Sequence, residues 1–405
     1  MNRIPRRVGP VLAAVQFVSA LCWIVQLACL PQLMQQLGLP PAALLWLLLL
    51  EHLVVAVCTM LTGVVADRLA RRHARIGPAV FATTLLAALA LGLLPSAAAH
   101  GATFGAAALA VVWAAASPVL RAPPLVLIAC HATRERQPGL IGAAVFGLGA
   151  AAAIAPYLER VLIEHGPQRT LGVAAAALAL VGLGLLAVER DLIGRAVPDA
   201  DGALEPSPAG RTPNDAALPP AARLRPTQQA ALVAATLLAA LALELHLQVN
   251  SAVFFRRHAA AGDVAYLTPV FWVGFILLLL PATLWIKRWG GMAVATLGAA
   301  LAGVIAVMLP QVPALQMLLN LQFLIGGATA CCLLGALAFA ATSVPGHAGR
   351  LCGALASMPA LVALLHLGWP SVAVQSDSVA AAFAVWFVGL AWFGAAAIAA
   401  VLRRC

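Results

Sequence analysis

The chain has 405 residues, of which 63% are hydrophobic and 9% are charged, and its formal net charge is +10. A soluble globular domain carries roughly 25% charged residues, so a water-soluble fold is excluded and a lipid bilayer must cover the apolar surface. The positive charge on its own would also fit a protein that binds nucleic acid.

Twelve apolar stretches are long enough to cross a bilayer, which predicts an all-α integral membrane protein with twelve transmembrane helices. Basic residues precede the first stretch as in a signal peptide, but that stretch is too long and has no clear cleavage site, so it is predicted to be the first span. No stretch shows the alternating pattern of a membrane β-barrel. The spans are predicted near residues 9–33, 42–66, 77–97, 103–130, 140–163, 169–188, 229–254, 265–286, 291–310, 313–342, 351–371 and 379–402.

Residues 191–228 form the one long polar segment of the chain. The segment contains seven prolines, mixes both signs of charge and has no apolar periodicity. These properties are typical of a flexible linker. The chain is therefore predicted to consist of an N-terminal six-helix bundle (1–190), a flexible cytoplasmic linker (191–228) and a C-terminal six-helix bundle (229–405).

With twelve spans, the 24 lysine and arginine residues sort unevenly between the two sides of the membrane. Nineteen lie on one side, four (Arg160, Arg169, Arg256 and Arg257) on the other, and Arg121 lies inside a span. The positive-inside rule places the basic side, and with it both termini, in the cytoplasm. The positive charge is thus explained by the orientation of the chain in the membrane, which argues against a nucleic-acid partner. The chain is predicted to be a multi-pass protein of the cell membrane, expected to be a bacterial inner membrane.

The stretch GVVADRLARR (residues 63–72) ends the second span and begins the loop after it. It resembles the signature loop of the major facilitator superfamily, G-x-x-x-D-R-x-G-R-R, with Ala70 where the family has glycine. The resemblance implies two pseudo-symmetric six-helix bundles and a gate at this loop. An acid at a helix end can pair with helix termini and basic residues of neighbouring spans. The predicted gating residues are Gly63, Asp67, Arg68, Arg71 and Arg72.

A degenerate copy of this loop, TLWIKRWG (residues 283–290), lies between the predicted spans eight and nine. Lys287 stands 220 residues after Asp67 and replaces the acid, so the second gate contact is predicted to be weakened or differently wired. The same offset aligns span one with span seven, as expected for parallel repeats. The glycine–proline signature of drug/proton antiporters is not clearly present in span five.

Ionisable residues at membrane depth usually mark a transport pathway, and Glu51, Arg121 and Glu244 are the candidates. Helix rise places Glu51 about 24 Å and Arg121 about 18 Å above the inner ends of their spans, which predicts an ion pair between them. A purely structural buried pair is the alternative. The resemblance adds that an arginine in span four often takes part in proton coupling.

Two polar stripes are predicted on span seven, one holding Glu244, Gln248 and Ser251 and the other His246 and Asn250. Span one carries a single polar stripe, formed by Gln16, Ser19, Trp23 and Gln26. Because the 220-residue offset maps Gln26 onto His246, the stripe with His246 is predicted to face the central cavity.

The predicted substrate-binding residues are Gln16, Trp23, Gln26, His246, Asn250, Gln316 and Asn320. The predicted proton-coupling residues are Glu51, Arg121, Glu244 and His246. Hydrogen bonding between helices is the alternative role for the lesser candidates, which are His52, Gln316, Asn320 and His366.

These features predict a secondary active transporter that moves a small organic solute by alternating access and is coupled to protons. A neutral or weakly charged solute, such as a sugar-like one, fits the amide-rich stripes. The alternatives are a membrane scaffold, assembly factor or receptor of the same fold that does not transport, and a drug/proton efflux antiporter. We predict no enzymatic activity, no cofactor and no metal, and a monomer whose partners are the solute and the lipid bilayer.

Overall fold

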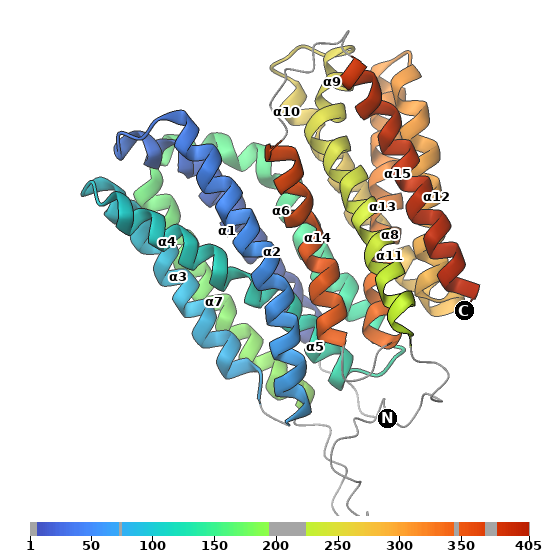
Figure 1. Cartoon of the computed structure of the whole chain (residues 1–405), viewed down its shortest axis with the longest axis horizontal. Helices are drawn as coiled ribbons and strands as arrows, with labels where there is room; N and C mark the ends of the chain where they lie inside the picture. Colours follow the sequence, from blue (N-terminus) through green and yellow to red (C-terminus); the bar gives the residue numbers. More distant parts are fainter. Residues whose placement is uncertain (1–5, 73–74, 194–223, 344–347, 369–378, 405) are drawn as a thin grey trace, which may run out of the picture.

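The computed structural model describes residues 6–72, 75–193, 224–343, 348–368 and 379–404, and within these ranges it is entirely helical (Figure 1). Twelve of the described helices, counting broken helices as one, are long and apolar enough to cross a membrane, as predicted. Four of the twelve spans consist of more than one helical segment.

The spans of the first half are α1 (Val8–Gln36), α2 (Pro41–Arg71), α3 (Gly77–Ala99), the broken span α4 (Thr103–Ala116), η1 (Ser117–Leu120) and α5 (Ala122–His131), then α6 (Gln137–His165) and α7 (Pro167–Ile193).

The spans of the second half are the broken span α8 (Pro226–Leu245), η4 (His246–Asn250) and α9 (Ser251–Arg256), then α10 (Val264–Leu267) with α11 (Pro269–Trp289), α12 (Gly291–Met308) followed by η5 (Leu309–Gln311), α13 (Leu315–Ser343), α14 (Ala348–Gly368) and α15 (Val379–Arg404).

The predicted linker is shorter than expected at both ends, because α7 continues through Ile193 and α8 begins at Pro226. Residues 194–223, which make up the rest of this predicted linker, lie outside the described residues. The side chain of His366 lies outside them as well.

The helices form two bundles that meet along two interfaces. Within the first bundle α1 packs on α6 and α7, and within the second α13 packs on α11 and α12. Between the bundles, α2 packs on α14 and α6 packs on α11. Spans two and eight are equivalent in the repeat, as are spans five and eleven, so a pseudo-two-fold axis relates the two interfaces.

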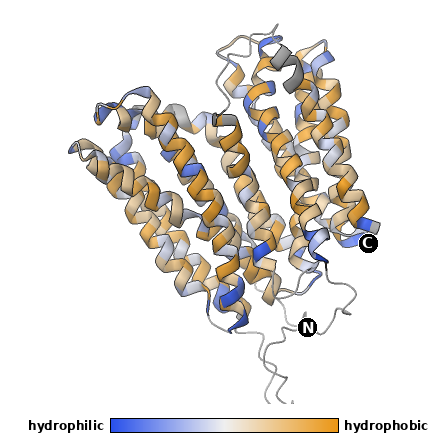
Figure 2. Ribbon diagram, in the orientation of Figure 1, coloured by the Kyte–Doolittle hydropathy of each residue, from blue (hydrophilic) through white to orange (hydrophobic). Residues whose placement is uncertain are grey.

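Hydrophobic residues predominate along the helices of both bundles (Figure 2), and many large apolar side chains are exposed. Trp46 is 71% exposed, Leu280 72% and Phe104 93%. Exposed apolar area on this scale would be a strong aggregation liability in water, whereas lipid tails solvate it without cost. The hydropathy of the surface therefore agrees with a bilayer as the surrounding solvent.

One end of the molecule gathers the start of α1, the end of α2 and the start of α14, and we call it the inner end (Figure 1). Here the guanidinium of Arg7 donates to both carboxylate oxygens of Asp191, at 2.7 and 2.6 Å. The carboxylate of Glu189 is buried and accepts hydrogen bonds from the backbone N–H groups of Ile76 and Gly77, at 2.6 and 2.8 Å. These contacts tie α1 and α3 to the end of α7.

Candidate functional site

Asp67 joins the two bundles at the inner end. Its carboxylate is 4% exposed and accepts hydrogen bonds from the backbone N–H groups of Gly349 and Arg350, both at 2.7 Å. These N–H groups belong to the first turn of α14, where an α-helix has unpaired donors and the positive end of its dipole. The acid of the predicted gating motif thus caps a helix of the opposite bundle, and we call this the Asp67 contact.

Glycines allow the backbones of α2 and α14 to approach closely next to the Asp67 contact. A Cβ atom on Gly63 would collide with the carbonyl group of Gly349. A Cβ atom on Gly353 would lie 3.0 Å from the carbonyl oxygen of Thr59. Small residues are typical of tightly packed membrane helices. Arg68, Arg71 and Arg72, the basic residues of the predicted motif, have exposed side chains.

The equivalent position in the second half is built differently. Thr283, which stands 220 residues after Gly63, faces α6, and a Cβ atom on Gly142 would lie 3.0 Å from its hydroxyl oxygen. Lys287 is exposed. A cation cannot cap the N-terminus of a helix as Asp67 does, because the donors and the dipole of that terminus repel positive charge. The α6–α11 interface therefore lacks a counterpart of the Asp67 contact.

The first bundle contains a buried amide–acid pair at membrane depth. The amide of Gln26 on α1 donates to the Oε1 atom of Glu51 on α2 at 2.9 Å, and both side chains are 0% exposed. The other carboxyl oxygen of Glu51 and the amide oxygen of Gln26 are buried, and neither has a hydrogen-bond partner in the described part of the chain. Two orphaned oxygens on one pair of side chains are unusual in a packed interior.

The predicted ion pair between Glu51 and Arg121 does not form. The guanidinium of Arg121 instead lies over the ring of Trp23, with 5.6 Å between its central carbon and the ring centroid. The ring nitrogen of Trp23 donates to the hydroxyl of Ser117 at 3.1 Å, and its ring centroid is 5.4 Å from that of Trp113. The rise per residue gave the depths of Glu51 and Arg121 in the membrane but not the directions of their side chains. Arg121 lies at the break in span four, and its side chain contacts Trp23 on α1.

Prolines cause the break in span four. The carbonyl of Leu120 would normally accept from the backbone nitrogen of residue 124, but Pro124 has no N–H. The amide of Gln16 on α1 donates to this carbonyl instead. Two residues of the polar stripe predicted on span one, Gln16 and Trp23, thus hydrogen-bond to span four, whereas Gln26 of the same stripe hydrogen-bonds to span two.

A second buried pair lies in the other bundle. The Nε2 atom of His246 is 2.9 Å from the amide oxygen of Gln322 on α13, and the His246 ring packs on Phe271. The amide nitrogen of Gln322 has no hydrogen-bond partner among the described residues. The sequence did not point to Gln322, because a single glutamine in an apolar run gives no periodic signal. Gln316 and Asn320 lie on another, exposed face of α13, where they contact each other at 3.3 Å.

The stripes predicted on span seven are rearranged by a π-helical turn, η4. Ser251 is buried together with His246 and Asn250, although it was predicted to share a stripe with Glu244. Glu244 is partly exposed and Gln248 is exposed. A π turn contains an extra residue, so every later side chain is rotated relative to a regular helix. Such turns occur often at functional sites.

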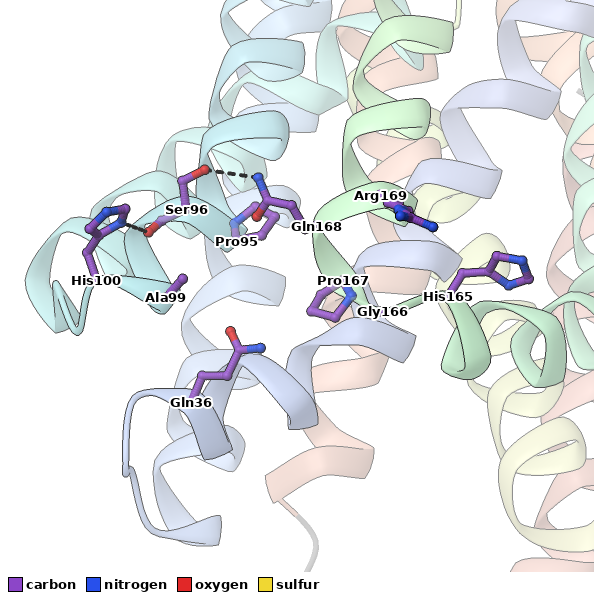
Figure 3. A pocket seen from close by; sticks show the side chains of 10 residues that line it. All are labelled: Gln36, Pro95, Ser96, Ala99, His100, His165, Gly166, Pro167, Gln168 and Arg169. Atoms are coloured by element: carbon purple, nitrogen blue, oxygen red, sulfur yellow. Dashed lines mark hydrogen bonds between the residues drawn. The ribbon is translucent and has the colours of Figure 1, made fainter.

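A cavity of about 530 Å³ lies at the outer end of the first bundle, between α1, α3 and the turn from α6 to α7 (Figure 3). Its polar lining consists of Gln36, Ser96, His100, His165, Gln168 and Arg169. His100 and His165 lie on opposite sides of it, and the Gln168 amide donates to the Ser96 hydroxyl at 3.2 Å. No predicted site residue lines this cavity.

Comparisons with known proteins agree with this architecture. A search of curated protein sequences finds no match. Among solved structures, a bacterial homologue of the iron transporter ferroportin in an outward-facing state matches with a TM-score of 0.72 and 14% identity, covering 98% of this chain and 100% of the other. The E. coli fucose:proton symporter matches with a TM-score of 0.67 and 14% identity, covering 99% of each chain.

The human organic anion transporter MFSD10 matches with a TM-score of 0.66 and 15% identity, covering 100% of this chain and 99% of the other. At these identities the matches establish the fold. The sequence family described as Major Facilitator Superfamily matches residues 12–365, which is most of the chain. Together with the twelve spans and the two related bundles, this match shows that the chain belongs to the major facilitator superfamily.

Proposed function

We propose that this protein is a secondary active transporter that moves a small organic solute by alternating access, coupled to protons. The family and the fold support transport. The observation that carries the proposal is the Asp67 contact, because two hydrogen bonds from one carboxylate hold α2 to the first turn of α14 at the inner end. A contact of this kind can open and close during a transport cycle.

The arginine distribution supports an orientation in which the inner end and both termini face the cytoplasm of a bacterial cell. With the inner end closed, the solute path of this state would face the outside. The similarity to a ferroportin homologue in an outward-facing state agrees with that assignment. The protein would act as a monomer in the inner membrane.

The amide–acid pair supports proton coupling. A proton on the free oxygen of Glu51 would turn that atom into a donor, and the amide oxygen of Gln26 is an acceptor without a partner. One proton would thus complete a second hydrogen bond within the same pair, so the neutral form suits this arrangement. Opening the site to water would favour release of the proton. Glu51 is therefore the proposed proton carrier.

The substitution Glu51→Gln tests this role in proteoliposomes. Glutamine keeps the size and the neutral charge of a protonated glutamate but cannot exchange a proton. We expect solute exchange under equal concentrations to continue, whereas accumulation driven by an inwardly directed proton gradient is lost. Glu135→Gln is the matched control, because Glu135 is an exposed glutamate outside the predicted site. A variant that still accumulates solute under the gradient would contradict proton coupling through Glu51.

A scaffold, assembly factor or receptor of the same fold is the second candidate, and the exposed Lys287 favours it because one half of the gate motif is lost. Counterflow and thermal stabilisation separate the two candidates. Purified protein is screened against sugars, organic acids, amines and amino acids, and compounds that raise its melting temperature are tested for counterflow. A transporter shows both effects for at least one compound, whereas a scaffold shows neither.

A further inference from the structure

The guanidinium of Arg121 has no acceptor among the described residues of the chain. It carries five N–H donors, and neither a carboxylate nor a carbonyl accepts from any of them. Its one described partner is the face of Trp23. Glu51, the carboxyl that was predicted to pair with it, accepts from Gln26 through one oxygen and forms no ion pair with Arg121. A positive charge at membrane depth is energetically costly unless an anion, from the protein or from a bound molecule, lies next to it.

The part of Arg121 that is exposed faces the inside of the protein. Apart from Arg121, all residues from Ala116 to Ala129 are buried. They include Ser117, Pro118, Pro124 and Leu125, which lie about one helical turn before or after Arg121. A segment with a lipid-facing side would expose these neighbours too, because residues three and four apart share a face. The space next to Arg121 is therefore internal.

Arg121 lies just above the closed inner end. Val126, five residues further along the same span, contacts Gly349, since a Cβ atom on that glycine would lie 2.6 Å from the Val126 side chain. Five residues of helix correspond to about 8 Å. The backbone of Arg121 thus stands about one and a half turns from Val126, the residue that contacts Gly349, in a span that packs on α13 and α14 of the other bundle.

We propose that Arg121 binds the charged group of the transported solute, and that this solute is a small organic monocarboxylate. A guanidinium is geometrically matched to a carboxylate, and one arginine balances one negative charge. The Trp23 ring fixes the guanidinium and adds an apolar surface for the rest of the solute. The inference rests on the transport function proposed above and replaces the sugar-like solute expected from the polar stripes.

Matched acid and amide probes test this assignment on the purified full chain. Benzoate and benzamide, propionate and propionamide, and lactate and lactamide have the same shapes within each pair but differ in charge. We expect at least one acid to stabilise the protein against heat and its amide to have no effect. Arg121→Gln should lower the affinity for that acid at least about tenfold, and Arg121→Lys should lose less, because it keeps the charge but not the paired donors.

Arg169→Gln is the control, since Arg169 is an exposed arginine at the outer end. Should Arg121→Gln fail to fold, protection of Arg121 from phenylglyoxal gives the same answer on the wild-type chain: the acid slows the modification and the amide does not.

Equal binding of acid and amide, unchanged affinity in Arg121→Gln, or no acid binding at all would overturn the proposal. Acid binding without counterflow would instead refute transport, and counterflow of neutral solutes alone would refute only the substrate class.

Discussion

The two interfaces between the bundles occupy equivalent places in the repeat but are built differently. The α2–α14 interface is closed at its inner end by the Asp67 contact and the glycines beside it. In Figure 1 these two helices lie close at their lower ends and separate toward their upper ends. A small number of polar contacts at one end is what a gate requires, because they can be broken without unfolding either helix.

The α6–α11 interface is in contact along its length. Gly142 lies against Thr283 near the inner end, Gly149 lies against Phe275 further along, and at the outer end the Tyr157 hydroxyl donates to the carbonyl of Tyr266 at 3.1 Å. Its contacts are mostly van der Waals contacts, which persist through small rotations. From this comparison we infer that the α2–α14 interface serves as the gate and the α6–α11 interface as the pivot.

The largest effect is expected from Gly63→Leu. The new side chain would meet the backbone of Gly349, which cannot move aside as a side chain can. Overpacking of this kind costs about 1–3 kcal/mol or more, so the inner end should no longer close and counterflow should be abolished. Gly172→Leu is the matched control, because a Cβ atom at Gly172 meets nothing within 4 Å. Equal activity of the two variants would show that the α2–α14 contact is not part of the gate.

Asp67→Ala should have the next largest effect. It leaves two helix-terminal N–H groups without their acceptor and removes a negative charge from the start of α14, at a cost of about 1–3 kcal/mol. The buried thiol of Cys352, close to this contact on α14, then becomes accessible. We expect maleimide labelling of Cys352 from the inner side to rise at least about fivefold. Labelling that stays at the wild-type rate would contradict a role for Asp67 in closure.

Lys287→Asp sharpens the comparison by giving the second interface the acid that it lacks. An exposed carboxylate near the start of α6 should stabilise the closed inner end by about 0.3–1 kcal/mol, so Cys352 labelling should fall modestly. Lys287→Gln separates the loss of the lysine from the gain of the acid. Faster labelling in the aspartate variant than in the glutamine variant would contradict this expectation.

Tyr157→Phe should have the smallest effect. It removes one hydrogen bond between partly exposed groups and keeps the contact between the two rings, whose centroids are 5.7 Å apart. The loss is about 0.5–1.5 kcal/mol, and a pivot that stays in contact should carry out counterflow at a rate within about tenfold of the wild type. A complete loss of transport would place a gate at this interface as well.

The spans and the position of Asp67 at the end of α2 were predictable because each rests on local signals. Apolar length marks a membrane helix, and Asp67 lies within a continuous motif. The partners of buried polar groups were not. Gln26 and Glu51, or His246 and Gln322, meet only after helices rotate about their axes, and a sequence does not show this rotation. The π turn adds a further rotation that displaced Ser251 from its predicted stripe.

The ties at the inner end of the first bundle have a mechanical consequence. Glu189 holds the start of α3 to α7, and Arg7 holds the start of α1 to the same helix. A force that acts on the inner end of α7 is therefore shared by α1, α3 and α7. The bundle then behaves as a stiff lever rather than as separate rods. Helix α7, which both ties reach, has 27 residues and is about 40 Å long, so it connects the inner end to the cavity at the outer end.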